Sequence, residues 1–454
     1  MPRLLIAAGL FALAVLSGPG AARAEPVAMG PDALRQLAAE AIGTGQTRLA
    51  LTLTDALLDR DAGDGGALLL RSRALRDTGR AEEAAAAARG AWRLSDTGAA
   101  RHLAALAMAQ ALASDGRRTQ AQWWLRRAAH HAPTAAMRQR AIEDFRYVRA
   151  RNPWATELSF SIAPESNVNN GSMRSTTRLY DLPFDFRLSG SAQALSGTEI
   201  AAGLVTRYRL NESRRHKTDL LLRVHQRTYR LSEEARAKAP DVRGSDFAFG
   251  TLSATLAYEA RRAPDGPPHW IAATAGQTWY GGDPYTRFLR LSGAQNWALD
   301  PRTGAQLALS VEGQQGVGGP DSRKLRVSAG LTRILGDGHR LRLRLAAVAS
   351  RSASAAREYD RLEAEARLAL GRPVLGMELD MGLTLAEDRY PQAVFGSGTR
   401  RDAEIGLDIT ADLPGLDYHG FIPSVTLRAA RTDSTRSLHD TEVLGLELGW
   451  RSAF

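Results

Sequence analysis

The last stretch of the chain, from Val443 to Phe454, constrains the fold more than any other segment. Its apolar and polar residues alternate with a period of two, which is the period of a β-strand. A strand that is apolar on one face and polar on the other suits a wall between lipid and water. A half-buried strand of a soluble sheet is the alternative. The apolar face holds Leu444, Leu446, Leu448 and Trp450, and the opposite face holds Gly445, Glu447, Gly449 and Arg451.

The same segment ends on an aromatic residue, Phe454, which follows Trp450 on the alternating strand. An alternating strand with an aromatic carboxyl terminus resembles the sorting signal of bacterial outer-membrane β-barrels. The resemblance implies that Trp450 and Phe454 form such a signal. It also implies three kinds of partner, which are periplasmic chaperones, the barrel-assembly machinery and outer-membrane lipid.

The N-terminus is typical of a secretory signal peptide over residues 1–24. Arg3 supplies the positive charge, Leu4 to Leu16 form an apolar stretch too short to span a bilayer, and Ala22-Arg23-Ala24 fits a cleavage site. We therefore expect an exported protein whose mature chain begins at Glu25. The sequence contains no cysteine, which excludes a disulfide framework, a thiolate metal site and a lipidated N-terminal cysteine.

No later segment has the roughly 18 or more consecutive apolar residues that a membrane helix needs. A membrane protein with this sequence must therefore cross the bilayer with strands, and only a closed barrel satisfies their backbone hydrogen bonds in lipid. The formal charge of +10 falls to +8 when Arg3 and Arg23 leave with the signal peptide. No basic run accompanies this charge, so we expect no nucleic acid among the partners. Arginine that lines a pore or faces lipid headgroups accounts for the charge better.

Residues 25–152 are expected to form an α-helical repeat domain. They are rich in alanine, leucine and arginine with a helical spacing, and glycine turns recur at Gly45, Gly79 and Gly116, at intervals of 34 and 37 residues. A repeat of this length is typical of stacked helical hairpins. Each turn is followed five residues later by Ala50, Ala84 or Ala121 and twelve residues later by Leu57, Ala91 or Ala128, with Pro133 after the last repeat.

These positions resemble the second-helix small residues and the terminal proline of tetratricopeptide (TPR) repeats, in which small side chains let paired helices approach closely. The Trp and Tyr that the TPR motif places on its first helix are missing. The resemblance implies a concave helical surface that binds a protein client. A helical domain that only packs against its neighbour is the alternative.

Beyond Pro153 the spacing changes to two and keeps that period through residues 153–454. One face of each segment is aliphatic, and the other holds charged residues, glycine or threonine. We therefore predict a transmembrane antiparallel β-barrel of about 14 strands, an even number as in single-chain bacterial barrels. The predicted strands are 155–163, 194–210, 217–230, 245–260, 269–281, 284–299, 303–313, 321–335, 338–350, 357–371, 373–387, 399–411, 419–431 and 439–454.

Longer connections are predicted to alternate with tight turns such as Asp300–Thr303, Gly336–Gly338 and Gly371–Pro373, although the short connection Gly281–Pro284 breaks the alternation. Long loops on one rim and short turns on the other are typical of outer-membrane barrels. An even strand count places the helical domain and Phe454 on the same, periplasmic rim. The register predicts that Arg342, Arg344, Glu378 and Asp408 face the lumen and that Leu343, Leu379 and Ile409 face lipid.

A short motif follows the first predicted strand. Residues 163–171 read Ala-Pro-Glu-Ser-Asn-Val-Asn-Asn-Gly, and because Asn and Gly favour turns, the plainest interpretation is a loop that leaves the strand. The string resembles the P-[DE]-S-N-[IV]-N-[NR] signature of the surface lipoprotein assembly modulators, the Slam family. Gly171 departs from that pattern, which has a small alanine there. The matching residues are Pro164, Glu165, Ser166, Asn167, Val168, Asn169 and Asn170.

The resemblance to Slam proteins covers the whole mature chain in architecture, but only this motif is specific in sequence. It implies an outer-membrane translocon that delivers lipoproteins or other surface proteins from the periplasm to the cell surface. Its client, a surface lipoprotein or surface receptor, would bind the TPR-like domain in the periplasm. An exporter of secreted polysaccharide and a porin with a periplasmic helical domain are the alternatives with the same architecture, and a soluble β-sandwich enzyme is a further one.

Motifs for covalent chemistry are weak. The adjacent His130 and His131 point about 100° apart on a helix, so they make a poor metal pair. His225, Ser253 and His439 have residue types found in catalytic triads, but no fixed spacing supports a triad. We therefore expect no enzyme activity, no catalytic residues, no cofactor and no metal.

Overall fold

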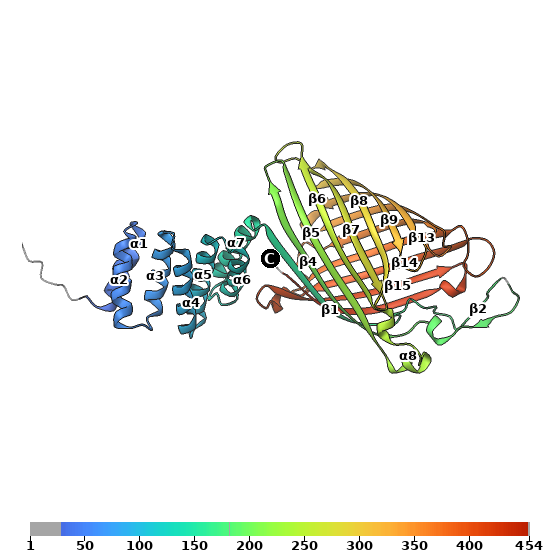
Figure 1. The fold of residues 1–454 in the computed structure, drawn as a ribbon, viewed down its shortest axis with the longest axis horizontal. Coiled ribbons are helices and arrows are strands. Elements are labelled where there is room, and N and C mark those ends of the chain that lie inside the picture. The colour runs from blue at the N-terminus through green and yellow to red at the C-terminus, as the bar shows by residue number, and fades with distance from the viewer. Residues whose placement is uncertain (1–28, 181, 453–454) are drawn as a thin grey trace, which may run out of the picture.

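A computed structural model describes residues 29–180 and 182–452. The predicted signal peptide, residues 1–24, and Phe454 lie outside the described residues. Seven helices form an elongated domain at one end of a large barrel, and the chain passes from the last helix directly into the first strand (Figure 1). None of the helices in the described part of the chain is long and apolar enough to cross a membrane.

The helical domain consists of three hairpins and a final helix. Gly45, Gly79 and Gly116 lie at the turns within the hairpins and adopt positive φ values of 75°, 78° and 77°, which glycine does without strain. The three predicted glycine turns are therefore confirmed. The helices are α1 (Pro31–Gly43), α2 (Thr47–Arg60), α3 (Gly65–Asp77), α4 (Ala81–Leu94), α5 (Gly98–Ser114), α6 (Arg118–His130) and α7 (Ala135–Arg151).

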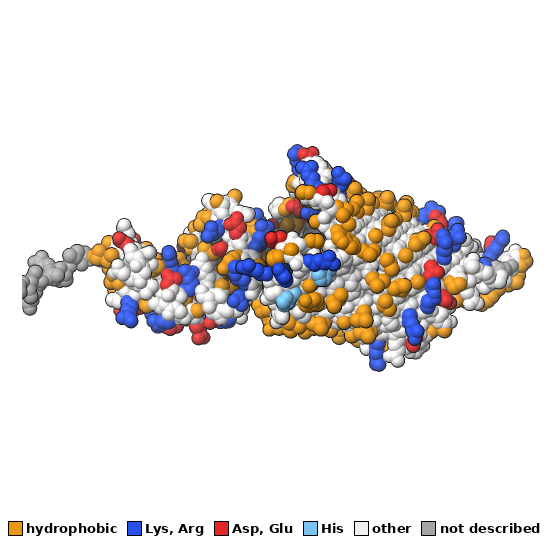
Figure 2. All heavy atoms as spheres, turned by 90° about the horizontal axis from the view of Figure 1, so that it is seen from above, with side chains coloured by type: hydrophobic (Ala, Val, Ile, Leu, Met, Phe, Trp, Pro, Cys, Tyr) orange, Lys and Arg blue, Asp and Glu red, His pale blue; other side chains and the backbone are white. Residues whose placement is uncertain are grey.

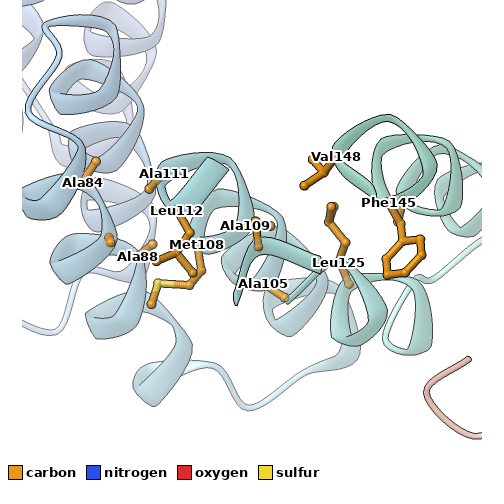
Figure 3. Packing of buried hydrophobic residues seen from close by; sticks show 14 of the residues in the cluster. Ala84, Ala88, Ala105, Met108, Ala109, Ala111, Leu112, Leu125, Phe145 and Val148 are labelled. Atoms are coloured by element: carbon orange, nitrogen blue, oxygen red, sulfur yellow. The ribbon is translucent and has the colours of Figure 1, made fainter. Parts of the chain in front are cut away.

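The core of this domain is built largely from alanine (Figure 3). Small side chains let neighbouring helices approach closely, and longer ones such as Leu112 and Leu125 fill the remaining space. The arrangement of stacked helical hairpins is TPR-like, as predicted. All six positions predicted to pack between helices are buried, with exposed fractions of 3% or less: Ala50, Leu57, Ala84, Ala91, Ala121 and Ala128.

The rest of the chain forms a closed antiparallel barrel of fourteen strands, in which each strand pairs with its neighbours in the sequence and the first pairs with the last. The predicted fold class and strand number are confirmed. The strands are β1 (Trp154–Glu165), β4 (Gly197–Glu212), β5 (His216–Leu231), β6 (Phe249–Arg261), β7 (Pro268–Tyr280), β8 (Asp283–Asp300), β9 (Thr303–Gly316), β10 (Ser322–Ile334), β11 (Arg340–Ser352), β12 (Tyr359–Ala369), β13 (Glu378–Tyr390), β14 (Arg400–Asp412), β15 (Phe421–Ser434) and β16 (Thr441–Ser452).

The barrel turns its apolar residues outward. Leu343, Leu345 and Leu362 are 41%, 64% and 58% exposed, and hydrophobic side chains spread over the wall while charged ones gather toward its ends (Figure 2). An apolar exterior without a covering layer suits a membrane and does not suit water. The residues next to these leucines in the sequence, such as Arg344 and Glu363, point to the opposite face, where they pair with each other.

The two rims carry different connections. We call the rim beside the helical domain the near rim and the opposite one the far rim. The far rim holds the two longest connections, residues 166–196 and 232–248, which include the short elements β2 (Thr176–Thr177), β3 (Phe186–Arg187) and α8 (Glu233–Lys238).

The near rim is less uniformly tight than predicted. The tenth connection was expected to be the tight turn Gly371–Pro373, but β13 begins only at Glu378, so that expectation is wrong. Val374 and Met377 form an isolated antiparallel bridge, and Leu375 and Gly376 between them have φ values of 51° and 80°. A two-residue hairpin turn therefore interrupts a stretch whose apolar alternation would otherwise continue the strand.

Candidate functional site

The lumen wall from β8 to β14 carries a network of arginine–carboxylate pairs. The guanidinium of Arg344 donates to Glu363 at 3.0 Å and to Glu365 at 2.6 Å. Arg326, one strand further, donates to Glu363 at 2.9 Å. Alternation puts these side chains on the face opposite the lipid-facing leucines, so the predicted lumen position of Arg344 is confirmed.

The network continues across the next strands. Arg361 donates to Asp388 at 3.0 Å and to Glu404 at 2.8 Å. Arg367 donates to Asp408 at 3.0 Å, which confirms the predicted lumen position of Asp408. Because each carboxylate faces an arginine, this wall presents both signs of charge within a few ångströms and favours neither an anionic nor a cationic solute.

A cavity of about 530 Å³ opens at this wall. It combines an aromatic ring with charges of both signs, which suits hydrogen bonding to polar polypeptide or sugar better than binding of one ion. Its lining includes Trp270, Arg290, Glu312, Lys324, Arg326 and Arg361. Among the residues that the structure describes, no cluster of three or more His, Asp or Glu side chains is placed to hold a metal ion.

The near rim contacts the helical domain through the connection between β14 and β15, residues Leu413–Gly420. Its tip is a second two-residue turn, in which His419 and Gly420 have φ values of 52° and 78°. Arg126 on α6 donates to the backbone oxygens of both residues, at 3.2 and 2.9 Å. Arg138 on α7 pairs with Asp417 of the same connection. We call this connection the docking hairpin.

The guanidinium of Arg126 also lies between two aromatic rings, 4.8 Å from the centroid of Phe145 and 4.9 Å from that of Phe421. Phe145 belongs to α7 and Phe421 begins β15, so one side chain joins both domains. Burial lowers the pKa of Arg126 to about 10, with help from the nearby Arg149, which still leaves it charged at neutral pH.

Histidines from the two domains meet at this contact. The ring of His419 stacks on that of His130 with 4.0 Å between centroids, and its centroid is 6.2 Å from that of His131. Burial lowers the pKa of His131 and of His419, and the neighbouring histidines add to the effect. The sequence pointed to His130 and His131 only as a pair and gave no sign that His419 lies against them. The sequence predicted a strand from residue 419, but His419 and Gly420 form the turn and β15 begins only at Phe421.

The Slam-like motif lies at the far rim, where β1 ends. Pro164 and Glu165 are the last residues of the strand, and Ser166 pairs with Leu444 of β16 in both directions. The amide of Ser166 donates to the oxygen of Leu444 at 3.0 Å, and the amide of Leu444 donates to Oγ of Ser166 at 2.8 Å. The motif therefore begins by joining the first strand of the barrel to the last.

Asn167 is 4% exposed and has no freedom to bind anything else. Its Oδ1 accepts from the amide of Gly171 at 2.8 Å, and its Nδ2 donates to the oxygens of Gly171 at 2.9 Å and Glu442 at 3.4 Å. The side chain thus closes a tight loop and ties it to β16. Within that loop Asn170 has a φ of 51°, a left-handed conformation that asparagine tolerates.

Asn169 ties the motif to the other side of the long connection. Its Nδ2 donates to the oxygens of Ser191 and Gln193, at 3.0 and 2.8 Å, and its Oδ1 accepts from the amide of Leu195 at 2.9 Å. Val168 between the two asparagines is buried against Leu195. The motif is a compact hydrogen-bonded anchor for residues 166–196, and its role as a family signature stays a prediction.

The remaining sequence-predicted residues are placed as follows. Trp450 is 48% exposed on the outer face of β16, with its ring centroid 6.3 Å from that of Phe160 on β1. Its partner in the predicted sorting signal, Phe454, lies outside the described residues. Nε2 of His439, at the far rim, lies 2.8 Å from Nη1 of Arg400 and accepts from it. Burial lowers the pKa of His439 to about 4, so it is neutral at neutral pH.

Comparison with known proteins gives the following. No family model matches the chain, and no curated protein matches it. Among solved structures, the Yersinia enterocolitica type III secretion translocator chaperone SycD matches with 16% identity over 27% of this chain and 92% of its own, at a TM-score of 0.24. The first TPR domain of human RPAP3 matches with 14% identity over 27% and 97%, at 0.24.

A third match covers the barrel. A loop-deletion mutant of OmpT, an outer membrane protein of Vibrio cholerae, matches with 10% identity over 66% of this chain and 99% of its own, at a TM-score of 0.33. Likenesses at these identities and scores carry no argument about function. The architecture described above rests on the helices, the strand order and the hydrogen bonds of this chain.

Proposed function

We propose that this chain is an outer-membrane protein that delivers lipoproteins or other surface proteins from the periplasm to the cell surface, with the helical domain in the periplasm. The observation that carries the proposal is the attachment of the repeats to the near rim. Arg126 and Arg138 tie the last repeat to the docking hairpin, so a client held by the helices lies beside the barrel. On this proposal the near rim is periplasmic and the far rim extracellular.

The helical domain offers a surface for such a client. Large apolar side chains remain exposed on its helices although its core is well filled, and exposed apolar side chains in stacked repeats commonly contact a protein. These side chains are Leu49, Leu103, Trp123 and Tyr147, which are 42–59% exposed.

The lumen supports guidance without a covalent step. Its mixed arginine–carboxylate wall offers hydrogen bonds to a polar chain and selects neither sign of charge, unlike a porin tuned to one kind of ion. We therefore propose no enzymatic activity and no cofactor. Assembly of the barrel itself would use periplasmic chaperones and the barrel-assembly machinery, which recognise the strand that carries Trp450 and Phe454.

The finer proposal is membership of the Slam family. It is supported by the motif Pro164–Asn170 and by the order of a TPR-like domain, a junction and a fourteen-stranded barrel. The hydrogen bonds of Asn167 and Asn169 give the motif a structural reason, because they hold the long far-rim connection against the barrel.

The proposal is tested by removing residues 32–149 from the mature chain. The barrel should still assemble, because its backbone hydrogen bonds close within residues beyond Trp154. Surface display of a candidate lipoprotein should be lost, as measured by protease accessibility on intact cells. Barrel abundance in the outer membrane is measured in the same cells.

A milder variant tests the contact instead of the whole domain. Arg126→Met with Arg138→Met removes the docking charges while keeping both domains, and it should reduce display. Arg89→Met with Arg140→Met, on exposed helical positions away from the docking hairpin, is the matched control and should leave display unchanged. If polysaccharide secretion fails and no surface protein changes, the exporter function replaces ours. If only uptake of small solutes changes, the chain is a porin.

A further inference from the structure

The seam between the first and last strands is the shortest pairing in the barrel. Among the described residues, β1 and β16 share four residue pairs, from Phe160 with Trp450 to Glu165 with Gly445. Every other neighbouring pair of strands shares ten or more. The segment Trp154–Ser159 therefore pairs with β4 on one side and with no described residue of β16 on the other.

The end of β16 is not the reason for this gap. Arg451 and Ser452 continue the strand and pair with Ile422 and Phe421 of β15. In the register of the seam these two residues would meet Ser159 and Leu158, but they do not pair with β1. The two strands have thus separated before β16 ends.

The direction of each backbone group follows from the register. The amide of Arg209 donates to the oxygen of Pro153 at 2.8 Å, so odd-numbered residues of β1 direct their N–H and C=O groups toward β4. Even-numbered residues direct theirs toward β16, as the bond from Ser166 to Leu444 shows. Pro164 fits this rule. It is at an even position, so its backbone faces β16, and because proline has no N–H it forms no pair with β16.

The unpaired groups can therefore be named. The amide of Trp154 donates to Oδ1 of Asn152 at 3.2 Å, which satisfies it locally. The N–H and C=O groups of Leu158 point toward β16 but do not pair with Ser452, the residue that the register places opposite. Those of Thr156 point the same way. A strand edge with unpaired N–H and C=O groups is a template for pairing with another strand.

The far end of the same seam is firmly held. Besides the two bonds between Ser166 and Leu444, Asn167 reaches Glu442, and the loop that follows is fastened to the last far-rim connection. Oγ of Ser172 donates to the oxygen of Ser437 at 3.1 Å, and Arg174 donates to Asp440 at 3.1 Å. Within the described part of the chain, the seam is consequently hydrogen-bonded at the far rim and has no residue pairs toward the near rim, where the helical domain lies.

The free edge also has the faces of a membrane strand. Trp154 and Leu158 point outward and are 50% and 62% exposed, while Glu157 and Ser159 lie on the lumen face. The edge follows directly on α7, with only Asn152 and Pro153 between helix and strand. A segment delivered by the helices would thus meet this edge first (Figure 1).

We propose that the Trp154–Ser159 edge of β1 accepts an extended segment of the transported client as an added β-strand, with alternating apolar and polar residues. The proposal rests on the proposed function and supplies its entry site. The client segment is held by main-chain hydrogen bonds to Thr156 and Leu158, which do not depend on its side chains. Alternation of apolar and polar residues in the segment places its apolar side chains against lipid.

The test uses the purified full chain in detergent micelles and a defined probe. The probe is a synthetic peptide of residues Val443–Trp450 carrying one added cysteine, because this segment already pairs with the other half of β1. The chain has no cysteine of its own, so Leu158→Cys gives a single reporter. Leu222→Cys is the matched control, since Leu222 is lipid-facing and 39% exposed but lies on β5, which is paired on both sides.

We expect disulfide capture of the peptide at Leu158→Cys to exceed capture at Leu222→Cys by about tenfold or more. Adding Thr156→Pro, which removes one edge N–H, should cut capture severalfold. Thr156→Val should not, although it also removes the hydroxyl that contacts Thr206 at 3.0 Å. Equal capture at both cysteines, or capture that Thr156→Pro does not change, would overturn the proposal. The peptide would then be binding through non-specific hydrophobic contacts and not as a paired strand.

Two other occupants are distinguished by the same reporter. If Leu158→Cys bonds chiefly to a cysteine placed at Phe454, the chain's own terminus fills the edge. If it bonds chiefly to its counterpart in a second copy, the edge is a dimer contact. Either result overturns the proposal.

In cells, Thr156→Pro should lower surface display of the candidate lipoprotein relative to Thr156→Val, at equal barrel abundance. Display that is equal in the two variants overturns the client role of this edge. The proposed function would still stand in that case if removal of residues 32–149 abolishes display.

Discussion

The helical domain and the barrel distribute the same side chains in opposite ways. Leu112 and Leu125 are 0% and 2% exposed inside the helical domain, whereas Leu345 and Leu362 cover the outside of the barrel. Leucine has the same preference in both places, which is to leave water. The comparison teaches that the solvent around each domain decides where leucine lies, with water around the helices and lipid around the barrel.

The charged residues show the complementary difference. On the helices, arginine and carboxylate pairs such as Arg80 with Glu83 sit at the water-facing surface. In the barrel, pairs such as Arg361 with Glu404 face the lumen. Surface pairs contribute little to stability because water screens them. The lumen pairs instead place arginines and carboxylates of different strands within hydrogen-bonding distance of one another.

The largest expected effect is a loss of barrel assembly that leaves the helical domain folded. Removing Phe454, or replacing it with Asp, should reduce outer-membrane levels of the chain by about tenfold or more, because an unassembled barrel cannot satisfy its strand edges. The helical domain has its own core and should fold regardless. The measurement is the amount of chain in outer-membrane fractions, with protease resistance of the helical fragment as the internal control. Normal outer-membrane levels would show that Phe454 is no sorting signal.

The next prediction compares one substitution in the two cores. Leu112→Ala should cost about 2–5 kcal/mol, because it removes buried methyl groups and leaves a cavity. Leu345→Ala should cost only about 1.5–2.5 kcal/mol, because lipid fills the space and only the transfer of the methyl groups is lost. Urea unfolding of the full chain in lipid vesicles, followed by far-ultraviolet circular dichroism at wavelengths that separate helix from strand, measures both. Equal costs would mean that the barrel exterior packs against something other than lipid.

A third prediction reverses the polarity of the barrel wall. Leu383→Arg should destabilise the barrel by about 2–4 kcal/mol, because Leu383 faces outward near the middle of β13 and is 40% exposed. Thr384→Arg, on the lumen face of the same strand, should cost about 1 kcal/mol or less, since water and carboxylates are available there. Folding into vesicles at a series of urea concentrations gives both values. A larger cost at Thr384 than at Leu383 would reverse the assignment of the two faces.

The sequence allowed most of this architecture to be predicted because the controlling signals are local. A period of two fixes which residues share a face, so Arg344 and Leu343 could be assigned without knowing their neighbours. Glycine at Gly45, Gly79 and Gly116 marks turns because its backbone tolerates positive φ. The turn at Leu375 was not predicted, because the apolar residues around it continue the alternation of the strand.

The contacts that matter most for the proposed function are not local and could not be predicted. Nothing near His419 in the sequence indicates that it stacks on His130, because the two residues come from different domains. The short pairing between β1 and β16 likewise depends on where two distant strands separate. The edge at Thr156 and Leu158 follows only from the strand pairs of the closed barrel.

The smallest expected effect concerns pH at the docking hairpin, where the two domains of the comparison meet. His419 is faced by His130, His131, Arg127, Asp417 and Tyr418. When the domains are docked, burial lowers the pKa of His419, and His130, His131 and Arg127 add to the effect. When the domains separate, the pKa returns toward its ordinary value of about 6.5. The separated state therefore binds more protons below about pH 6.5, so docking is fully favourable above that pH and weakens as the pH falls through it.

Acidification from about pH 7.5 to about pH 5.5 should thus lower the ratio of docked to undocked chain by about three- to tenfold. Energy transfer between dyes on Ala86→Cys and Arg302→Cys, in a chain with no other cysteine, reports that ratio. His419→Phe keeps an aromatic ring against His130 but cannot be protonated, so it should lose most of the pH response. If His419→Phe responds to pH as strongly as the natural chain, the titration lies elsewhere, and the ion pair between Arg138 and Asp417 becomes the contact to examine by its dependence on salt.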